Sequence, residues 1–466
     1  MELTVSKRTL RILLVAGILL PGTVLTVSVL SASDNPRLSD NSRVDTYREQ
    51  ASLSYEERDK LVDDRNGTTV ITAGTGVDGA ILAYSPSGRI EYYNETYDSY
   101  ADVDPVPNTS STVLYVANSQ VEIPGCPNCL RNVVETVNLS TGETRRLHTH
   151  IDYFEASVRW HDVDQLDDSR LLVADIDEDT IFVVNTTTDQ TDWLWRTQSE
   201  YQLSSGGSFP DDWTHVNDID RVEEGRYMVS LRNQDRVVFV DRETGLDEAW
   251  TLGTEDNYSR LYEQHNPDYI PEENGGPAVL VADSENNRIV EYQRTADGKW
   301  TQSWNWQSVN LQWPRDADRL PNGHTLIAAT NSNRVIEVNQ DGDVIWSVPF
   351  TKPYDVERVK TGDGSTGGPS ANKAGLTAVN TSGVERSSGE TQNRSLLTSL
   401  SKQVWFVIKD AIPSWLLNAV LFVMPSWIQF TDLPLLVLMG GSTFSWAIFE
   451  FRWSRYQLRS PLSRTE

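Results

Sequence analysis

The sequence predicts an all-β fold, a six-bladed β-propeller with four-stranded blades. The first observation is a repeat in the middle of the chain, with units that begin at Asp102, Trp160, Thr214, Gln264 and Trp313. Each unit holds four short runs with alternating apolar residues, separated by Asp, Asn and Gly turns. The hairpin signals "STG", "ETG", "ADG" and "QDG" lie between third and fourth runs. A four-stranded repeat of about 50 residues is typical of a propeller blade.

The second observation is that the strand count closes a ring. The five units end at Val348, and one strand, Tyr354 to Val359, is left over after them. Three strands are left over before them, in "TTVITAG", "AILAYSPSG" and "RIEYYN". One strand and three strands make a sixth blade closed by both ends of the domain, which hides the sheet edges. We therefore predict the propeller over residues 66–360.

The segments that flank the propeller predict a membrane-attached chain. Residues 1–33 hold an apolar run after basic residues and read as a signal anchor, with a cleaved signal peptide as the alternative. The lead-in 34–65 is polar and is expected to be helical or disordered. Residues 361–400 are rich in Gly, Ser and Thr and predict a flexible linker. Residues 401–451 predict C-terminal hydrophobic membrane segments before a basic cytoplasmic tail, 452–466. Counted with the N-terminal segment, the whole chain is expected to have two spans and one interfacial segment, with three spans as the alternative.

The charge of the chain excludes one class of partner. The formal net charge is −27, with 67 acidic residues against 40 basic ones. A nucleic-acid binder needs a cationic footprint, so no nucleic-acid partner is expected. The acidic residues are spread along the chain, which favours a halophilic archaeal source. In about 1 M salt the Debye length is about 3 Å, so an anion site there must rely on close contacts.

Sequons and cysteines favour an extracellular propeller and a glycoprotein. Eight Asn-x-Ser/Thr sequons are present, at Asn66, Asn94, Asn108, Asn138, Asn185, Asn257, Asn380 and Asn393. The cysteines, Cys126 and Cys129, stand in "GCPNC". A loop disulfide is the preferred interpretation outside a cell. A redox motif would need a thioredoxin-like context, and a zinc site would lack its second half.

Histidines mark the candidate site. His161, His215 and His265 each stand at the start of the first strand of consecutive repeats, and Arg315 lies near that place in the next unit. We interpret these positions as one repeat-equivalent slot. First strands line the central channel of a propeller, so the side chains are expected to converge at one mouth. Common descent of the repeats is the alternative explanation, and His324 in "NGHTL" reads as a structural turn residue.

Arg232 follows the second strand of its blade, where the counterparts are Ile176, Ser284 and Asn331. Its partner is either a local carboxylate such as Asp235 or a bound oxyanion, whose geometry suits a guanidinium. Three imidazoles can also bind zinc. An adjacent arginine favours an anion over a divalent cation, so no metal and no cofactor are expected.

The segment "HVNDIDRVEEGRYMVSLRNQD" resembles the arylsulfate sulfotransferase family, whose six-bladed propellers transfer sulfuryl groups between phenols without a nucleotide donor. The family's "H-x-N-S/D" and "S-x-R-x-Q-D/S" motifs are matched by His215, Asn217, Arg232 and Gln234. "QHNPDY" resembles the segment that carries the nucleophilic histidine, here His265. "WHDVDQLDDSRLLV" resembles the segment with a sulfate-binding histidine. The resemblance covers about residues 100–350, and the membrane segments depart from the soluble members of the family.

The resemblance implies a catalytic set and a set that binds substrate. The first comprises the nucleophile His265 with His215, Arg232 and His161, and the second comprises Asn217, Gln234 and Arg315. An imidazole nitrogen is a competent nucleophile at neutral pH, and sulfuryl transfer, like phosphoryl transfer, depends on placement and charge stabilisation. The expected cycle is ping-pong through a sulfohistidine, from an aryl sulfate donor to a phenol or glycan acceptor at the outer membrane face.

Two other functions remain as alternatives. A non-catalytic extracellular propeller would serve as a binding or scaffold module. A quinoprotein-like dehydrogenase is suggested by tryptophans near the blade ends. These tryptophans, Trp195, Trp250, Trp304 and Trp346, occupy a repeating fourth-strand position and read more simply as packing between blades.

Overall fold

A computed structural model describes residues 6–30, 40–74, 79–153, 159–308, 310–380, 412–424 and 433–453. The chain divides into two compact units, and each is described by itself. One comprises Met1–Ser42, Gln392–Ile412 and Pro425–Glu466. The other, which carries the propeller, comprises Arg43–Thr391 and Pro413–Met424.

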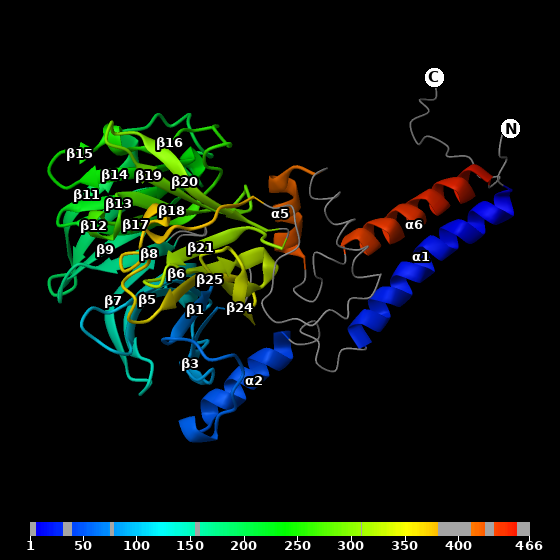
Figure 1. Cartoon of the computed structure of the whole chain (residues 1–466), viewed down its shortest axis with the longest axis horizontal. Helices are drawn as coiled ribbons and strands as arrows, with labels where there is room; N and C mark the ends of the chain where they lie inside the picture. Colours follow the sequence, from blue (N-terminus) through cyan, green and yellow to red (C-terminus); the bar gives the residue numbers. More distant parts are fainter. Residues whose placement is uncertain are drawn as a thin grey trace. The chain divides into compact units, whose positions relative to one another are not determined.

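The propeller has six sheets of four antiparallel strands, two of them extended by a short fifth strand (Figure 1). The closing blade is β25 (Pro353–Arg358), β1 (Thr69–Ala73), β2 (Ala80–Tyr84) and β3 (Ile90–Asn94). The next two blades are β4 (Ser99–Pro105), β5 (Thr112–Ile123), β6 (Cys126–Asn138) and β7 (Thr144–Asp152), then β8 (Trp160–Gln165), β9 (Arg170–Asp175), β10 (Thr180–Asn185) and β11 (Gln190–Arg196).

The other three blades follow in chain order. The first of them is β12 (Val216–Glu223), β13 (Arg226–Leu231), β14 (Arg236–Asp241) and β15 (Gly245–Leu246), with β16 (Leu252–Gly253) also paired to β14. The second is β17 (His265–Ile270), β18 (Ala278–Asp283), β19 (Arg288–Arg294) and β20 (Trp300–Gln307), with β26 (Val379–Asn380) parallel to β20. The third is β21 (Pro314–Arg319), β22 (Thr325–Ala329), β23 (Arg334–Val338) and β24 (Val344–Pro349).

The inner strands contact one another around the ring in the order β4, β8, β12, β17, β21 and β25. The predicted six-bladed architecture is confirmed, and so is its closing blade, in which β25 pairs with β1 from the other end of the domain. The pairing of each inner strand with the next strand of its blade shifts register at a bulge. Examples lie between Trp160 and Asp162 and between Pro314 and Asp316. Such bulges re-aim a side chain and are common beside active sites.

The core lies between the sheets. Trp195 packs with Val229 of the next blade, Trp304 with Ile327, and Trp346 with residues of the closing blade. Each of these indoles has at most 6% of its surface exposed. These three tryptophans therefore pack between blades, as the sequence predicted, because their large apolar area fills the space where two twisted sheets diverge. The fourth, Trp250, is not on a fourth strand as predicted: it ends the 3₁₀ turn η5 (Glu248–Trp250), and its ring meets that of Trp300 edge to face at 5.9 Å.

The predicted flexible linker over 361–400 is wrong for its first part. Residues 361–380 pack on the propeller and include α3 (Ala371–Ala374) and β26. Ser365 and Ser370 are almost completely buried. A Cβ on Gly368 would lie only 1.8 Å from the carbonyl oxygen of Arg319. The glycines therefore serve close packing here, and the rest of the predicted linker, 381–400, lies outside the described residues.

The lead-in is helical in its first described part, and residues 58–65 that follow are irregular. It contains α2 (Asp40–Ser52) and the short 3₁₀ turn η2 (Tyr55–Glu57). Tyr47 of α2 is 7% exposed and packs with Ile71 and Tyr84 of the closing blade. This contact explains why a polar helix with little apolar surface is ordered.

The first unit pairs α1 (Lys7–Leu30) with α6 (Leu433–Trp453). Arg11 donates to Glu450 over 2.8 Å and lies over the Trp453 ring. Within the described ranges, no helix combines the length and the apolar character that crossing a bilayer requires. The membrane segments remain a prediction, and residues 454–466 of the predicted tail lie outside the described residues. The other described helix of the C-terminal region, α5 (Ser414–Val423), belongs to the propeller unit.

Candidate active site

Three histidine rings gather where the inner strands begin. The centroids of His161 and His215 are 5.4 Å apart, and their rings meet edge to face. Tyr354 lies between the histidines, with its ring centroid 5.9 Å from that of His161 and 6.5 Å from that of His265. The predicted convergence is therefore present, and Tyr354 is an addition that the sequence reasoning missed.

The prediction that the three histidines occupy one equivalent slot is wrong. His161 sits at the bulge of β8, one residue before Asp162. The aspartates that match Asp162 in three other blades are Asp218, Asp316 and Asp355. The residues just before them are Asn217, Arg315 and Tyr354. His215 instead precedes β12 with a positive φ of 53°, and His265 is the first residue of β17. Unequal bulges and loops, rather than strict repetition, bring the rings together.

The hydrogen bonds of His265 define its tautomer. Its Nδ1 is 3.2 Å from the carbonyl oxygen of Glu263, which can only accept, so Nδ1 carries the proton. Nδ1 is also 2.9 Å from Ser284 Oγ, whose own proton is donated to the Pro314 carbonyl over 2.7 Å. Nε2 therefore holds the lone pair. It has no hydrogen-bond partner among the described residues.

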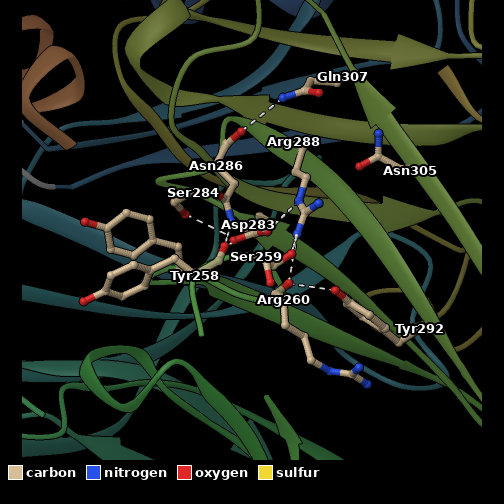
Figure 2. Close-up of polar contacts among 12 residues, drawn as sticks. Tyr258, Ser259, Arg260, Asp283, Ser284, Asn286, Arg288, Tyr292, Asn305 and Gln307 are labelled. Carbon is tan, nitrogen blue, oxygen red and sulfur yellow. Dashed lines mark hydrogen bonds and ion pairs between the residues drawn. The ribbon is translucent and has the colours of Figure 1, made fainter. Parts of the chain in front are cut away.

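The loop before His265 is tied to its own blade (Figure 2). Arg288 donates from Nε to Asp283 over 2.6 Å and from one terminal nitrogen to the carbonyls of Ser259 and Arg260. The hydroxyl of Tyr292 donates to the Arg260 carbonyl over 2.7 Å. The amide of Asn286 donates to the Tyr258 carbonyl over 2.7 Å. These contacts fix the backbone that presents Glu263 and His265.

Arg232 and His215 share a carboxylate. Nδ1 of His215 contacts Asp212 Oδ1, while Nε2 accepts from Arg232 over 2.9 Å. The other guanidinium nitrogen of Arg232 is 3.0 Å from Asp212 Oδ2. The local carboxylate beside Arg232 is therefore Asp212, and Asp235 instead accepts from the backbone of Asp256 and Glu263. The Asp212 side chain is 50% exposed and is the part of this group most open to exchange with a ligand.

Two predicted substrate-binding residues point into the protein. Asn217 donates to the Gln264 carbonyl over 2.9 Å, so its amide positions the residue before His265. Gln234 is completely buried and donates to Ser205 Oγ over 3.0 Å. Both amides hold backbone and loops in place around the histidines.

Arg315 lies beside the histidine cluster, with its guanidinium 4.7 Å from the centre of the Tyr354 ring and 4.4 Å from that of Trp313. Burial lowers the pKa of Arg315 to about 10, so it stays a cation at neutral pH. Its Nε, the Tyr354 hydroxyl and His161 Nδ1 are buried without hydrogen-bond partners among the described residues. Buried polar atoms usually find partners; a ligand oxyanion would satisfy the Arg315 N–H and the Tyr354 hydroxyl, whereas an unprotonated Nδ1 of His161 can only accept.

Burial is the main reason that the histidines are neutral. It lowers the pKa of His161, His215 and His265 well below the usual value, and the nearby guanidiniums lower it further. A neutral imidazole keeps a lone pair for attack or for proton acceptance. The described clusters that could hold a metal ion consist of carboxylates deeper in the channel and include no histidine.

A pocket of about 370 Å³ opens beside Arg232. Asp212, Arg232, Tyr258 and Tyr262 are among its lining residues. The two tyrosine rings are stacked with centroids 4.1 Å apart, and Tyr258 is 44% exposed. The tyrosine rings suit an aromatic ligand. Arg232 is the one cationic group among the described lining residues, which include five acidic residues and none of the three histidines.

The helix α5 packs at the same mouth. Asn418 donates to Glu285 over 2.9 Å and accepts from Asn331 over 3.2 Å. The Phe422 ring meets Trp313 edge to face at 5.1 Å, and Trp313 in turn meets His265 at 5.9 Å. The sequence reasoning assigned this stretch to the membrane segments, but Leu417 and Asn418 are buried against the propeller unit.

The two cysteines lie in a hairpin of the blade formed by β4 to β7. Cys126 and Cys129 form a disulfide near the β5–β6 turn, with Cα atoms 5.5 Å apart. Among the residues missed, Tyr354 had a sequence signal, because "YDVE" in the leftover strand matches "HDVD" at His161. Ser284 and Trp313 had none beyond their places at strand ends.

The propeller is similar in sequence to one known protein family. A family model described as Arylsulfotransferase (ASST) matches residues 146–351, a range that includes the three histidines, Arg232 and Arg315. No curated protein matches the chain.

Similar solved structures include a putative 6-phosphogluconolactonase from Bacteroides fragilis NCTC 9343, at 11% identity and a TM-score of 0.42, over 64% of this chain and 99% of that one. The periplasmic gluconolactonase PpgL of Pseudomonas aeruginosa has 13% identity and a TM-score of 0.42, over 62% of this chain and 98% of that one. Likenesses at this level bear on neither substrate nor reaction. The family match supports an arylsulfotransferase assignment for residues 146–351 and suggests a transferase that acts on aryl sulfates.

Proposed function

We propose that the chain transfers a sulfuryl group from an aryl sulfate to an acceptor hydroxyl, without a nucleotide donor, through a sulfohistidine at His265. The observation that carries the proposal is the state of His265. Its Nδ1–H is held by Glu263 and Ser284, and its Nε2 lone pair is left without a partner among the described residues. A fixed, neutral imidazole is what nucleophilic catalysis requires of histidine.

In the first half-reaction, Nε2 of His265 forms a bond to sulfur while the bond between sulfur and the aryl oxygen breaks. The electron pair leaves with the phenolate, which takes a proton from water. Arg315, Arg232 and the hydroxyl of Tyr354 are the donors available to the non-bridging sulfuryl oxygens. Stabilisation of such charge by fixed donors is commonly a large part of catalysis.

In the second half-reaction, the acceptor oxygen attacks sulfur and the bond from sulfur to Nε2 breaks. The acceptor proton moves to a base and from there to water. His161 is the candidate base, because burial keeps it neutral and its Nδ1 has no partner among the described residues. His215 is bound on both ring nitrogens, so we assign it to the orientation of Arg232.

The pocket beside Arg232 supports an aromatic donor. The stacked rings of Tyr258 and Tyr262 offer a face to a phenyl group, while Arg232 offers donors to its sulfate. A phenol could occupy the same surface as acceptor in the second half-reaction, and a surface glycan is the other acceptor that we propose. We also propose that the propeller lies outside the cell and is held at the membrane by its terminal segments.

The test is sulfuryl transfer from p-nitrophenyl sulfate to phenol in high salt, with wild type, His265→Ala and His324→Gln. His324 contacts Glu337 over 2.7 Å in a turn, so His324→Gln is the control. We expect transfer by wild type and the control, none by His265→Ala, and one trapped SO₃ group on the peptide that holds His265. A folded wild type that releases no p-nitrophenol but binds sulfate would contradict the proposal and favour a non-catalytic binding module.

A further inference from the structure

The inner strands carry a second pattern of polar residues that the proposed reaction does not use. Five inner strands hold two acidic residues two positions apart, and β17 holds one. Residues two apart in a strand face the same side. These pairs are Asp102 and Asp104, Asp162 and Asp164, Asp218 and Asp220, Asp316 and Asp318, and Asp355 and Glu357, with Asp268 alone in β17.

These side chains line one small cavity in the channel. Its volume is about 40 Å³, and its lining comprises all of these carboxylates together with Asp363. No lysine or arginine is among the described lining residues. The cavity lies further along the same strands than His161 and Arg315, and Asp363 and Gly364 border it.

Part of this acidity has a structural purpose. Asp162 accepts from the backbone of Ile219 over 2.6 Å, and Asp355 accepts from that of Val103 over 2.7 Å. Asp316 accepts in the same way from Val356 over 3.1 Å. Each of these bonds joins one blade to another, so it accounts for one carboxylate oxygen per aspartate. Among the second acidic residues, Asp220 makes the same kind of bond, from the backbone N–H of Tyr269 over 2.8 Å, and Glu357 accepts from Gly364 over 2.7 Å.

Four of the five second acidic residues still have an oxygen without a hydrogen-bond partner in the described part of the chain. One oxygen each of Asp104, Asp164, Asp318 and Glu357 is buried and has no hydrogen-bond partner among the described residues. Asp164, Asp318 and Glu357 are 7%, 2% and 4% exposed, and all line the cavity. An unpaired buried carboxylate is among the most unfavourable groups in a protein interior. These oxygens need either protons or a cation.

Their spacing suits a cation. Asp104, Glu357 and Asp363 offer oxygens that all lie within 4.8 Å of one another, and so do Asp268, Asp316 and Asp318. Three oxygens within this separation lie at most about 2.8 Å from a common point, so small side-chain movements bring them to about 2.4 Å, the usual distance to calcium. Ligand sets made only of oxygen favour calcium or magnesium over zinc. Calcium accepts irregular, carboxylate-rich geometry, whereas magnesium requires a near-ideal octahedron and tends to keep its waters.

We propose that this acidic channel, lined by the inner-strand carboxylates and Asp363, binds calcium at the triad Asp104, Glu357 and Asp363, with Asp268, Asp316 and Asp318 as a second position. The ion joins the closing strand β25 to β4 and to the segment after β25. It therefore stabilises the ring at its point of closure. It also offsets the negative charge of carboxylates that lie further along the strands that carry His161 and Arg315, where we propose that an anionic substrate reacts.

The experiment uses the full chain, stripped with EDTA and returned to fixed ionic strength. Melting temperature is measured with calcium chloride, magnesium chloride or sodium chloride, and native mass spectrometry counts bound ions. We expect calcium to raise the melting temperature by about 5 °C or more, magnesium to do less and sodium nothing. One or two calcium ions per chain are expected.

Glu357→Gln and Asp318→Asn test one triad each, and Asp168→Asn, on an exposed turn, is the matched control. Glu357→Gln should lose most of the calcium response while Asp168→Asn keeps it. If Glu357→Gln does not fold, Asp318→Asn and the ion count on wild type decide. Equal shifts from calcium and sodium, no bound calcium, or a full response in both triad variants would overturn the proposal. None of these readouts depends on sulfuryl transfer.

Discussion

Nδ1 of His265 lies 2.9 Å from Ser284 Oγ, and the Ser284 hydroxyl donates onward to the Pro314 carbonyl. The serine therefore accepts from the imidazole and helps to hold the proton on Nδ1. The chain of bonds joins the first residue of β17 to the end of β18 and to the first residue of β21. The orientation of the proposed nucleophile thus depends on two neighbouring blades.

Replacing Ser284 with alanine removes one of the two acceptors of Nδ1–H. The Glu263 carbonyl remains, so the tautomer is kept but held less firmly. A neutral hydrogen bond contributes about 1 kcal/mol, which corresponds to a rate loss of about fivefold. We expect this loss in the single-turnover formation of sulfohistidine, with little change in KM. Ser303→Ala, on β20 of the same blade, should keep the wild-type rate; equal losses in both variants would point to general destabilisation.

Replacing Tyr354 with phenylalanine tests the unpartnered hydroxyl beside the histidines. If this hydroxyl donates to the sulfuryl oxygens, its loss should lower kcat/KM by about 10- to 100-fold, the effect of a hydrogen bond to a charged group. The melting temperature should stay equal or rise, because the buried oxygen has no partner among the described residues. Tyr153→Phe, at a residue that is 65% exposed, is the control. Unchanged kcat/KM in Tyr354→Phe would remove the hydroxyl from the mechanism.

The fold could be predicted almost entirely from the sequence, because blade formation depends on local signals. Alternating apolar residues define the strands, and Asp/Gly turns define the hairpins. The repeat then fixes the ring, including the pairing of β25 with β1. The segment 361–380 departs from its prediction because its glycines and serines, which are typical of flexible linkers, are packed against the propeller. At Gly368 the absence of a Cβ instead permits contact with the Arg319 backbone.

The site could be predicted only in part. The repeat placed His161, His215 and His265 at one mouth, but it could not show that bulges put them in different slots. It also could not show that Asn217 and Gln234 point into the protein, since side-chain direction depends on tertiary partners. Tyr354 and the paired acids of the inner strands were readable as repeats. Their recurrence alone does not mark a site, because tyrosine and aspartate also recur in repeats for structural reasons, as the blade-to-blade bonds of Asp162 and Asp316 show.

A substitution of Arg232 tests whether its guanidinium binds the sulfuryl oxygens. Arg232→Lys keeps the charge but loses the fork that contacts Asp212 and His215 together. We expect kcat/KM for p-nitrophenyl sulfate to fall by about 100-fold or more, as for the loss of a key oxyanion donor. Arg196→Gln, whose arginine side chain is 50% exposed beside Glu178, should behave as wild type. A loss confined to KM would mean that Arg232 binds sulfate equally in the ground state and in the transition state.

The pH dependence of the first half-reaction follows from the lowered pKa of His265. The usual imidazole value is 6.5, and burial, followed by the charges of Arg315 and Arg232, lowers the folded-state pKa well below it. The nucleophile therefore stays neutral as pH falls through 6.5, where an exposed histidine would protonate. We expect single-turnover release of p-nitrophenol to stay constant from about pH 8 to pH 6.5 and to fall only at lower pH.

The lowered pKa values of the three histidines also make the folded state less stable as pH falls. Below pH 6.5 the unfolded chain binds protons at these histidines while the folded chain does not. Their contribution to the free energy of unfolding is therefore present above pH 6.5 and is lost as pH falls toward the folded-state values. His161→Asn and His215→Asn should each flatten part of the acid limb of the unfolding free energy, measured in a denaturant series at each pH. For the pH profile of p-nitrophenol release, a fall in rate with its midpoint near pH 6.5 would show that His265 is open to water. That result would contradict its buried, pre-oriented state.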